Sequence, residues 1–162
     1  MKRRDSRETA FALLFEWSFK DDTLDQIIEQ AELGRNTVVD PFAYQLASTA
    51  IENCTTLDIL IQKFSQKWKL SRLSKVTLAI LRLSVCEITL MEDIPVGASI
   101  NEAVELSKKF STEDEAAFVN GVLGGIAREL NVDIAAEDIL VPEETATVQE
   151  EVPSQTEQSA EA

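Results

Sequence analysis

The run Ile94–Leu123, IPVGASINEAVELSKKFSTEDEAAFVNGVL, decides the fold because it sets two helices one after the other with little slack between them. Pro95 cannot continue a preceding helix, so a new helix is expected from about Ser99. Thr112, with Glu115 three residues later, has the spacing of a capping box that starts the second helix. The run therefore predicts two adjoining helices near the end of the folded part.

The second of these helices carries three glycines inside its apolar pattern, Gly121, Gly124 and Gly125. A glycine inside a helix costs about 1 kcal/mol relative to alanine. Three of them predict close approach by a neighbouring backbone. A phosphate-binding loop is disfavoured, because these glycines lie within a helix and do not follow a strand.

Capping signals and apolar periodicity predict five further helices upstream. Their expected starts are, in order, the Asp5/Glu8 pair, the Thr23/Gln26 pair, Asp40-Pro41, about Thr56 and about Ser71. The first helix is expected to reach about Phe19, the second to end at Gly34, the fourth to reach about Gln66 and the fifth to reach about Met91. The fifth is apolar around most of its circumference, so it should be the central, buried helix. With no convincing strand, the chain is expected to be all-α, a single orthogonal bundle of about seven helices.

Composition divides the chain into a domain at residues 1–130 and a tail at 131–162. The tail holds nine of the 29 acidic residues and none of the 15 basic ones, so it accounts for −9 of the net charge of −14. Its composition predicts disorder. The short apolar patch Ile134–Val141 could dock on the body or on a partner.

Several classes of protein are disfavoured by what the sequence lacks. No apolar segment resembles a signal peptide or approaches the length of a membrane span, so a soluble, cytoplasmic protein is expected. The chain has no histidine and no phosphate-binding loop motif, which disfavours catalysis and predicts neither a metal nor a cofactor. Cys54 and Cys86 are isolated on apolar faces and are expected to be buried thiols.

The basic N-terminus is the best candidate for a binding site. Lys2, Arg3, Arg4 and Arg7 fall within six residues, and on a helix Arg3 and Arg7 lie one turn apart. Guanidinium groups bind phosphate in pairs of hydrogen bonds and stack on bases. Taken alone, such a run is either a solubilising terminus or an RNA site.

Four ordered segments resemble the NusB family of bacterial transcription antitermination factors. They are RRDSRETAFALLFEW at Arg3–Trp17, KVTLAILRLSVCE at Lys75–Glu87, INEAVELSKKF at Ile100–Phe110 and FVNGVL at Phe118–Leu123. The resemblance covers about residues 1–130 and implies a non-enzymatic helical fold. Asp5 inside the basic segment and Cys86, where the family usually has an aromatic residue, depart from the pattern.

The resemblance also implies an RNA site. Its N-terminal arginines would be Arg3, Arg4 and Arg7 with Lys2 beside them, and its aromatic contact would be Phe15. Phe110, Asp114 and Phe118 would form the opposite edge. From the residues alone, Phe15 and Phe118 fit a core pattern equally well, Asp114 fits a helix start, and Trp17 fits core or rim packing.

The implied function is antitermination together with the ribosomal protein NusE. The pair would bind boxA-type single-stranded RNA in nascent ribosomal transcripts and join the RNA polymerase antitermination complex with other Nus factors. The low pI and sparse basic patch leave an alternative open, a protein-interaction module with the same fold, a homodimer with little or no RNA binding. The acidic tail could also compete with RNA for the basic N-terminus.

Overall fold

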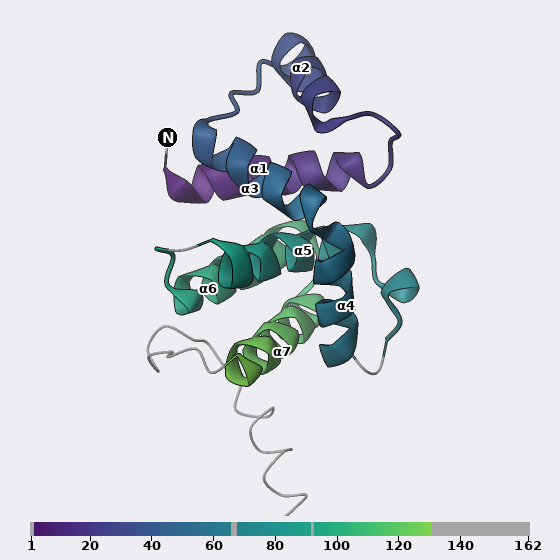
Figure 1. The fold of residues 1–162 in the computed structure, drawn as a ribbon, viewed down its shortest axis with the longest axis vertical. Coiled ribbons are helices and arrows are strands. Elements are labelled where there is room, and N and C mark those ends of the chain that lie inside the picture. Colours follow the sequence, from purple (N-terminus) through teal and green to yellow (C-terminus); the bar gives the residue numbers. More distant parts are fainter. Residues whose placement is uncertain (1, 66–67, 92, 131–162) are drawn as a thin grey trace, which may run out of the picture.

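A computed structural model describes residues 2–65, 68–91 and 93–130, which form helices and no strand (Figure 1). The elements are α1 (Arg3–Trp17), α2 (Leu24–Arg35), α3 (Pro41–Glu52), α4 (Cys54–Phe64), the short 3₁₀ helix η1 (Leu70–Arg72), α5 (Lys75–Leu90), α6 (Val96–Phe110) and α7 (Glu113–Glu129). The expected all-α bundle of about seven helices is confirmed. The expected tail and its apolar patch lie outside the described residues.

The helix α5 is the centre of the bundle, as its apolar circumference predicts. It contacts α1, α3, α4, α6 and α7, and its residues Ala79, Ile80, Leu81, Leu83 and Val85 are buried. In Figure 1, α1 and α3 lie on one side of α5, and α4 and α7 lie on the other, while α2 stands at the end of the molecule beyond α1. One core therefore joins the first and the last helix of the described chain.

Three helix starts differ from the sequence prediction. The first helix begins at Arg3, so Asp5 lies in its first turn instead of capping it. The sixth begins at Val96, directly after Pro95, and Ser99 is a buried residue inside it. Helix α5 begins at Lys75, where the hydroxyl of Ser74 accepts a hydrogen bond from the Thr77 backbone N–H.

The predicted caps are confirmed at two helices and half confirmed at a third. Thr23 and Gln26 form a reciprocal capping box, and Asp40 caps α3 ahead of Pro41. Thr112 accepts from the Glu115 N–H, but the Glu115 carboxylate does not return the contact. It accepts hydrogen bonds from Ser74 and Thr77 on the neighbouring segment instead, so the expected cap partly serves as a clasp between α7 and α5.

Two predictions that rest on glycine need correction. Helix α2 continues past Gly34 and ends at Arg35, followed by the cap residue Asn36 in the left-handed conformation with φ 55°. In α7, only Gly125 meets a close neighbour: a Cβ there would lie 2.8 Å from a ring carbon of Phe64, a side chain and not a backbone. A Cβ at Gly121 would meet nothing within 4 Å. Close packing therefore explains one of the three glycines.

Candidate nucleic-acid interface

The three N-terminal arginines share one helix but point to three different neighbours. The Arg3 guanidinium lies 3.9 Å from the centroid of the Phe42 ring on α3. Arg4 reaches α6, where its Nε and Nη2 donate to the two carboxylate oxygens of Glu102 at 3.0 and 2.8 Å. Arg7 turns toward α5. The segment is therefore an exposed start of a helix, at Lys2, Arg3 and Arg4, followed by a buried arginine.

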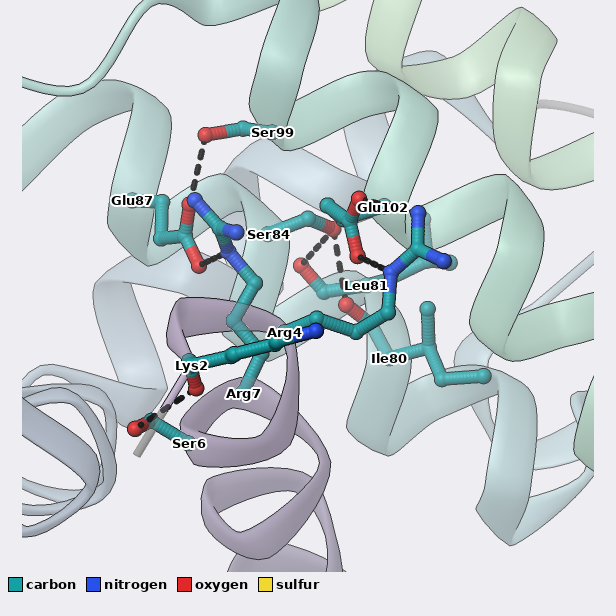
Figure 2. A network of polar contacts seen from close by, with 10 residues as sticks. All are labelled: Lys2, Arg4, Ser6, Arg7, Ile80, Leu81, Ser84, Glu87, Ser99 and Glu102. Carbon is teal, nitrogen blue, oxygen red and sulfur yellow. Dashed lines mark hydrogen bonds and ion pairs between the residues drawn. The ribbon is translucent and has the colours of Figure 1, made fainter. Parts of the chain in front are cut away.

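Arg7 is part of a buried polar network that ties three helices together (Figure 2). The residue is 7% exposed, and its Nε donates to Oε2 of Glu87 at 2.6 Å. The hydroxyl of Ser99 on α6 donates to the other oxygen of Glu87, also at 2.6 Å. Both carboxylate oxygens therefore have a donor, which is what a buried charge requires. This arrangement fixes α1 against α5 and α6.

Arg4 and Glu102 form a different kind of pair. Figure 2 shows the Arg4 guanidinium alongside the Glu102 carboxylate, and the Arg4 side chain is 67% exposed. Exposed pairs are generally worth about 0–1 kcal/mol. A phosphate could therefore replace Glu102 as the partner of Arg4 at small cost.

A row of phenyl rings follows α1 away from the arginines. Phe110, at the end of α6, lies 5.1 Å from Phe11, and Phe11 lies 6.0 Å from Phe15, both measured between ring centroids. Phe11 is buried, Phe15 is half-buried and Phe110 is exposed. The Lys109 amino group stands 5.4 Å from the Phe110 centroid and also contacts Glu8 on α1. Phe15 and Phe110 thus both contact Phe11, so the two predicted residues belong to one row of rings.

The other two predicted residues, Asp114 and Phe118, line a hollow of about 230 Å³ at the start of α7. Trp68 and Arg72 line it as well, from the segment that leads into α5. Trp68 is 49% exposed and Phe118 is half-buried, so aromatic surface faces the hollow from two elements. Asp114 is exposed. Such a hollow offers rings for stacking, a guanidinium for phosphate and a carboxylate for base N–H groups.

One wall of the hollow is held rigid by the clasp between α5 and α7. Glu115 accepts hydrogen bonds from the hydroxyls of Thr77 and Ser74, the latter at 3.1 Å. The Thr77 hydrogen bond, aided by Ser111 and Ser74, holds the pKa of Glu115 below its usual value, against the opposing effect of burial. Glu115 is therefore ionised and accepts the hydrogen bonds that hold this wall together, whereas its neighbour Asp114 is exposed.

Sequence reasoning missed Trp68 and Arg72 as site residues. They fall in a connection and not on a periodic helix face, so the apolar pattern gives them no role. The signal that could have found them is the alternation of cations with an aromatic residue in KWKLSR, residues 67–72. That alternation is typical of surfaces that bind single-stranded nucleic acid. Trp17, in contrast, packs against the core, in agreement with the core or rim packing that the sequence predicts.

Neither cysteine has the surroundings of a reactive thiol. Cys86 is fully buried, and desolvation together with the nearby Glu87 raises its pKa to about 12. Cys54 is half-buried, and burial raises its pKa as well. Within residues 2–65, 68–91 and 93–130, no group of His, Cys, Asp or Glu side chains could hold a metal ion. No helix in these ranges is long and apolar enough to cross a membrane.

Comparison with known proteins identifies the family. The model of the NusB family matches residues 4–128, which is most of the chain. The chain belongs to the NusB family. Its membership confirms the resemblance to this family.

Relatives of this NusB-family chain are named transcription antitermination proteins. The Natranaerobius thermophilus protein is 43% identical over 136 residues, a match that covers 81% of this chain and 98% of that protein. The Bacillus subtilis protein is 42% identical over 130 residues, with 80% and 98% covered. Both are called "Transcription antitermination protein NusB". The family is one of regulatory proteins, so the expectation that the chain is not an enzyme is confirmed.

Solved structures of the family share the fold. NusB of T. maritima superimposes with a TM-score of 0.71 at 35% identity, covering 85% of this chain and 96% of that one. A structure described as antitermination factors NusB and NusE in complex with dsRNA gives a TM-score of 0.71 at 28% identity, covering 78% and 96%. The same fold therefore occurs in a complex that contains both a protein partner and RNA.

Proposed function

We propose that this chain is a transcription antitermination factor that pairs with NusE and binds boxA-type single-stranded RNA in nascent ribosomal transcripts. In this role it helps to keep cytoplasmic RNA polymerase processive, together with other Nus factors. The observation that carries the proposal is the convergence of Phe15, Phe110, Asp114 and Phe118 at one end of the bundle, on a chain whose relatives are named antitermination proteins.

The RNA backbone is assigned to the exposed start of α1. Lys2 and Arg4 are exposed, and Arg3 keeps one face of its guanidinium over Phe42. Phosphate contacts of this kind position a nucleic acid without reading its sequence. Arg4 must leave Glu102 to make one, which is feasible because the Arg4 side chain is 67% exposed.

The bases are assigned to the aromatic end. Phe110 and Phe15 offer ring faces, and the hollow between Trp68 and Phe118 takes an unstacked base, whose edge meets Asp114. Proteins recognise single-stranded RNA in this way, by stacking on aromatic rings and by hydrogen bonds to base edges. Sequence preference would come from the edge contact, because stacking alone tolerates every base.

Arg7 has an indirect part in this proposal. Its side chain is 8% exposed and is engaged with Glu87, so its main contribution is to hold α1, with Arg3 and Arg4, against the rest of the bundle. Direct contact between RNA and the small exposed part of the Arg7 side chain remains a prediction.

The test is fluorescence anisotropy of a boxA-type single strand, titrated with the full chain with and without purified NusE, at several salt concentrations. We expect tight binding that depends on NusE. Changing Arg3 and Arg4 together to Ala should weaken it and reduce the slope of log affinity against log salt by about 0.7 for each phosphate that the protein no longer neutralises. The matched control changes Arg35 and Arg128 to Ala, which are exposed arginines on α2 and on the last turn of α7. Equal effects of the two double variants would refute the assigned backbone contacts.

A second function has one observation in its favour. Arg4 and Arg7 are both paired with carboxylates, and the chain as a whole carries −14, so the basic segment attracts phosphate only weakly in the free protein. A dimeric protein-interaction module would then suffice. Light scattering of the free chain, combined with the anisotropy test, separates the two: a stable dimer without RNA binding in the presence of NusE favours the second function.

A further inference from the structure

The row of phenyl rings does not end at the predicted residues. Phe19 follows the end of α1, and its ring meets Phe15 edge-on, with centroids 4.8 Å apart and planes at 80°. Phe19 is 58% exposed, the largest exposed fraction of any aromatic side chain among the described residues. The ring therefore has one contact with the established row and an open face. Because most of the Phe19 side chain is exposed, burial of apolar surface does not explain why the ring lies here.

The backbone holds this exposed ring in a fixed place. The Phe19 N–H donates to the carbonyl of Glu16 at 3.1 Å, and the N–H of Lys20 donates to Trp17 at 3.3 Å. The hydroxyl of Ser18 also donates to the Phe15 carbonyl at 2.6 Å. These hydrogen bonds continue the last turn of α1 beyond its formal end. A platform that is already ordered loses little entropy when a ligand binds.

A cation stands beside the platform. The amino group of Lys75, at the first position of α5, lies 5.5 Å from the centroid of Phe19, and no carboxylate of the described residues lies within salt-bridge distance of it. Lys75 also borders an open depression of about 400 Å³ next to the turn after α1. Lys20, Arg82, Asp21 and Asp22 share this depression, but Lys20 contacts Glu16 and Arg82 contacts Asp58. Lys75 is thus the cation of this surface that is available to a phosphate.

Lys75 also connects the two halves of the site. Its neighbours Ser74 and Thr77 line the hollow that contains Trp68 and Phe118, while Lys75 and Leu78 line the depression next to Phe19. The start of α5 therefore separates the two recesses, with Lys75 directed toward the Phe19 side. A strand that leaves the hollow meets Lys75 before it reaches Phe19.

We infer that Phe19 and Lys75 form a further nucleotide subsite, in which a base stacks on Phe19 and the adjoining phosphate contacts Lys75. This inference rests on the proposed RNA-binding function and extends the proposed path of the RNA past Phe15. A ring with an open face and an amino group beside it is what a nucleotide needs, and stacking of this kind accepts any base. The subsite should therefore add affinity without adding sequence preference.

The test compares Phe19→Ala and Lys75→Gln in the full chain with NusE present, using the boxA-type strand and versions shortened by one nucleotide at a time from either end. We expect Phe19→Ala to weaken binding of the full strand by about 5-fold or more, with the salt slope unchanged. Lys75→Gln should weaken binding and reduce the salt slope by about 0.7. For one shortened strand, both variants should bind as the unaltered chain does, because the nucleotide of this subsite is then missing.

Two variants serve as controls. Tyr44→Ala removes another exposed aromatic residue, on α3, and Arg128→Gln removes an exposed cation at the far end of α7. Neither should change RNA affinity. If Arg3 and Arg4 variants weaken binding while Phe19→Ala and Lys75→Gln do not, the subsite is refuted and the proposed function stands. If the unaltered chain with NusE binds no RNA, both are refuted.

Discussion

At the scale of single residues, Arg4 and Arg7, one turn apart on α1, have different roles. Arg7 is buried against Glu87, whereas Arg4 lies at the surface against Glu102. Removing one partner of a buried ion pair leaves an uncompensated charge and costs about 3–5 kcal/mol, whereas an exposed pair is worth about 0–1 kcal/mol. Sequence spacing places both residues on one helix, but it cannot tell which of them the neighbouring helices bury.

We therefore expect Arg7→Met to lower the free energy of unfolding by about 3–5 kcal/mol, and Arg4→Met to lower it by less than about 1 kcal/mol. Urea unfolding followed by circular dichroism measures both. The double change Arg7→Met with Glu87→Met should recover much of the loss, because no buried charge is then left alone. Equal stability of the two single variants would contradict the structural role of Arg7.

A second residue-scale prediction concerns Glu102, which competes with RNA for Arg4. Its carboxylate accepts two hydrogen bonds from the guanidinium and adds a negative charge beside the proposed phosphate path. Glu102→Gln should therefore increase RNA affinity at low salt, while Arg4→Ala should decrease it. Glu52→Gln, which removes an exposed carboxylate on α3, is the control. A decrease on Glu102→Gln would mean that this carboxylate orients Arg4 for RNA and does not compete with it.

At the scale of elements, the glycines of α7 give a matched pair for a stability test. Gly121 is exposed with open space around it, so Gly121→Ala should raise the free energy of unfolding by about 0.5–1 kcal/mol through helix propensity. Gly125 faces Phe64, so Gly125→Ala must displace that ring and should lower the free energy of unfolding by about 1–3 kcal/mol. Thermal unfolding of the two variants would show shifts of opposite sign. Shifts of the same sign would mean that Phe64 moves aside freely.

The clasp between α5 and α7 predicts a pH dependence. The pKa of Glu115 is lowered chiefly by the Thr77 hydrogen bond, so the clasp contributes its full stability above the usual carboxyl value of 4.5 and loses it as pH falls through the lowered pKa. Glu115→Gln should therefore flatten the loss of stability below pH 4.5 and leave the rest of the curve parallel. Asp40, whose pKa is lowered mainly by Ser6, keeps its own acid dependence in both proteins. The measurement is the unfolding midpoint of both proteins above and below pH 4.5. An equal loss of stability in both proteins below pH 4.5 would contradict a stabilising role of the Glu115 hydrogen bonds to Ser74 and Thr77.

Elements also show what the sequence could predict. The order of the helices, the central position of α5 and the caps at Thr23 and Asp40 follow from periodicity and local hydrogen bonding, which the sequence displays directly. The sequence pattern places the start of α5 too early, because Ser71 lies inside η1 and Ser74 is the residue that caps α5. The partners of Glu115 could not be predicted, because a carboxylate three residues after a threonine fits a cap equally well.

At the scale of the whole molecule, the candidate site depends on which ends of helices meet. The segment after α1 meets the start of α5, the starts of α5 and α7 contact each other, and the end of α6 meets Phe11 on α1, so packing brings together aromatic residues that lie far apart in the sequence. Phe15, Phe110 and Phe118 could be named in advance only through the family resemblance. Phe19 and Lys75 become visible only in the folded chain, because their shared surface is a product of packing, whereas Trp68 and Arg72 carry a local signal in the KWKLSR segment.

The distribution of charge along the whole chain also bears on RNA binding. The family match ends at residue 128, and residues 131–162 carry nine acids and no base. Helix α7 spans about 24 Å at 1.5 Å per residue, which is the distance from the end of the match back to the site at the start of α7. At up to about 3.3 Å per residue, the 32 residues of this segment can span more than that distance. The acidic segment is therefore long enough to reach the cations that the RNA needs.

We expect a chain ending at Leu130 to bind the boxA-type strand more tightly than the full chain at low salt, because an intramolecular competitor acts at high effective concentration. The difference should shrink toward high salt, since the screening length falls from about 10 Å at 0.1 M to about 3 Å at 1 M. Anisotropy of both proteins across a salt series measures it. A full-length variant with the nine acids changed to Asn or Gln should behave like the shortened chain, which assigns the effect to charge and not to length. Equal affinities of all three proteins at low salt would mean that the acidic segment does not compete for the RNA surface, and the cations at the start of α1 and α5 would then face RNA unopposed.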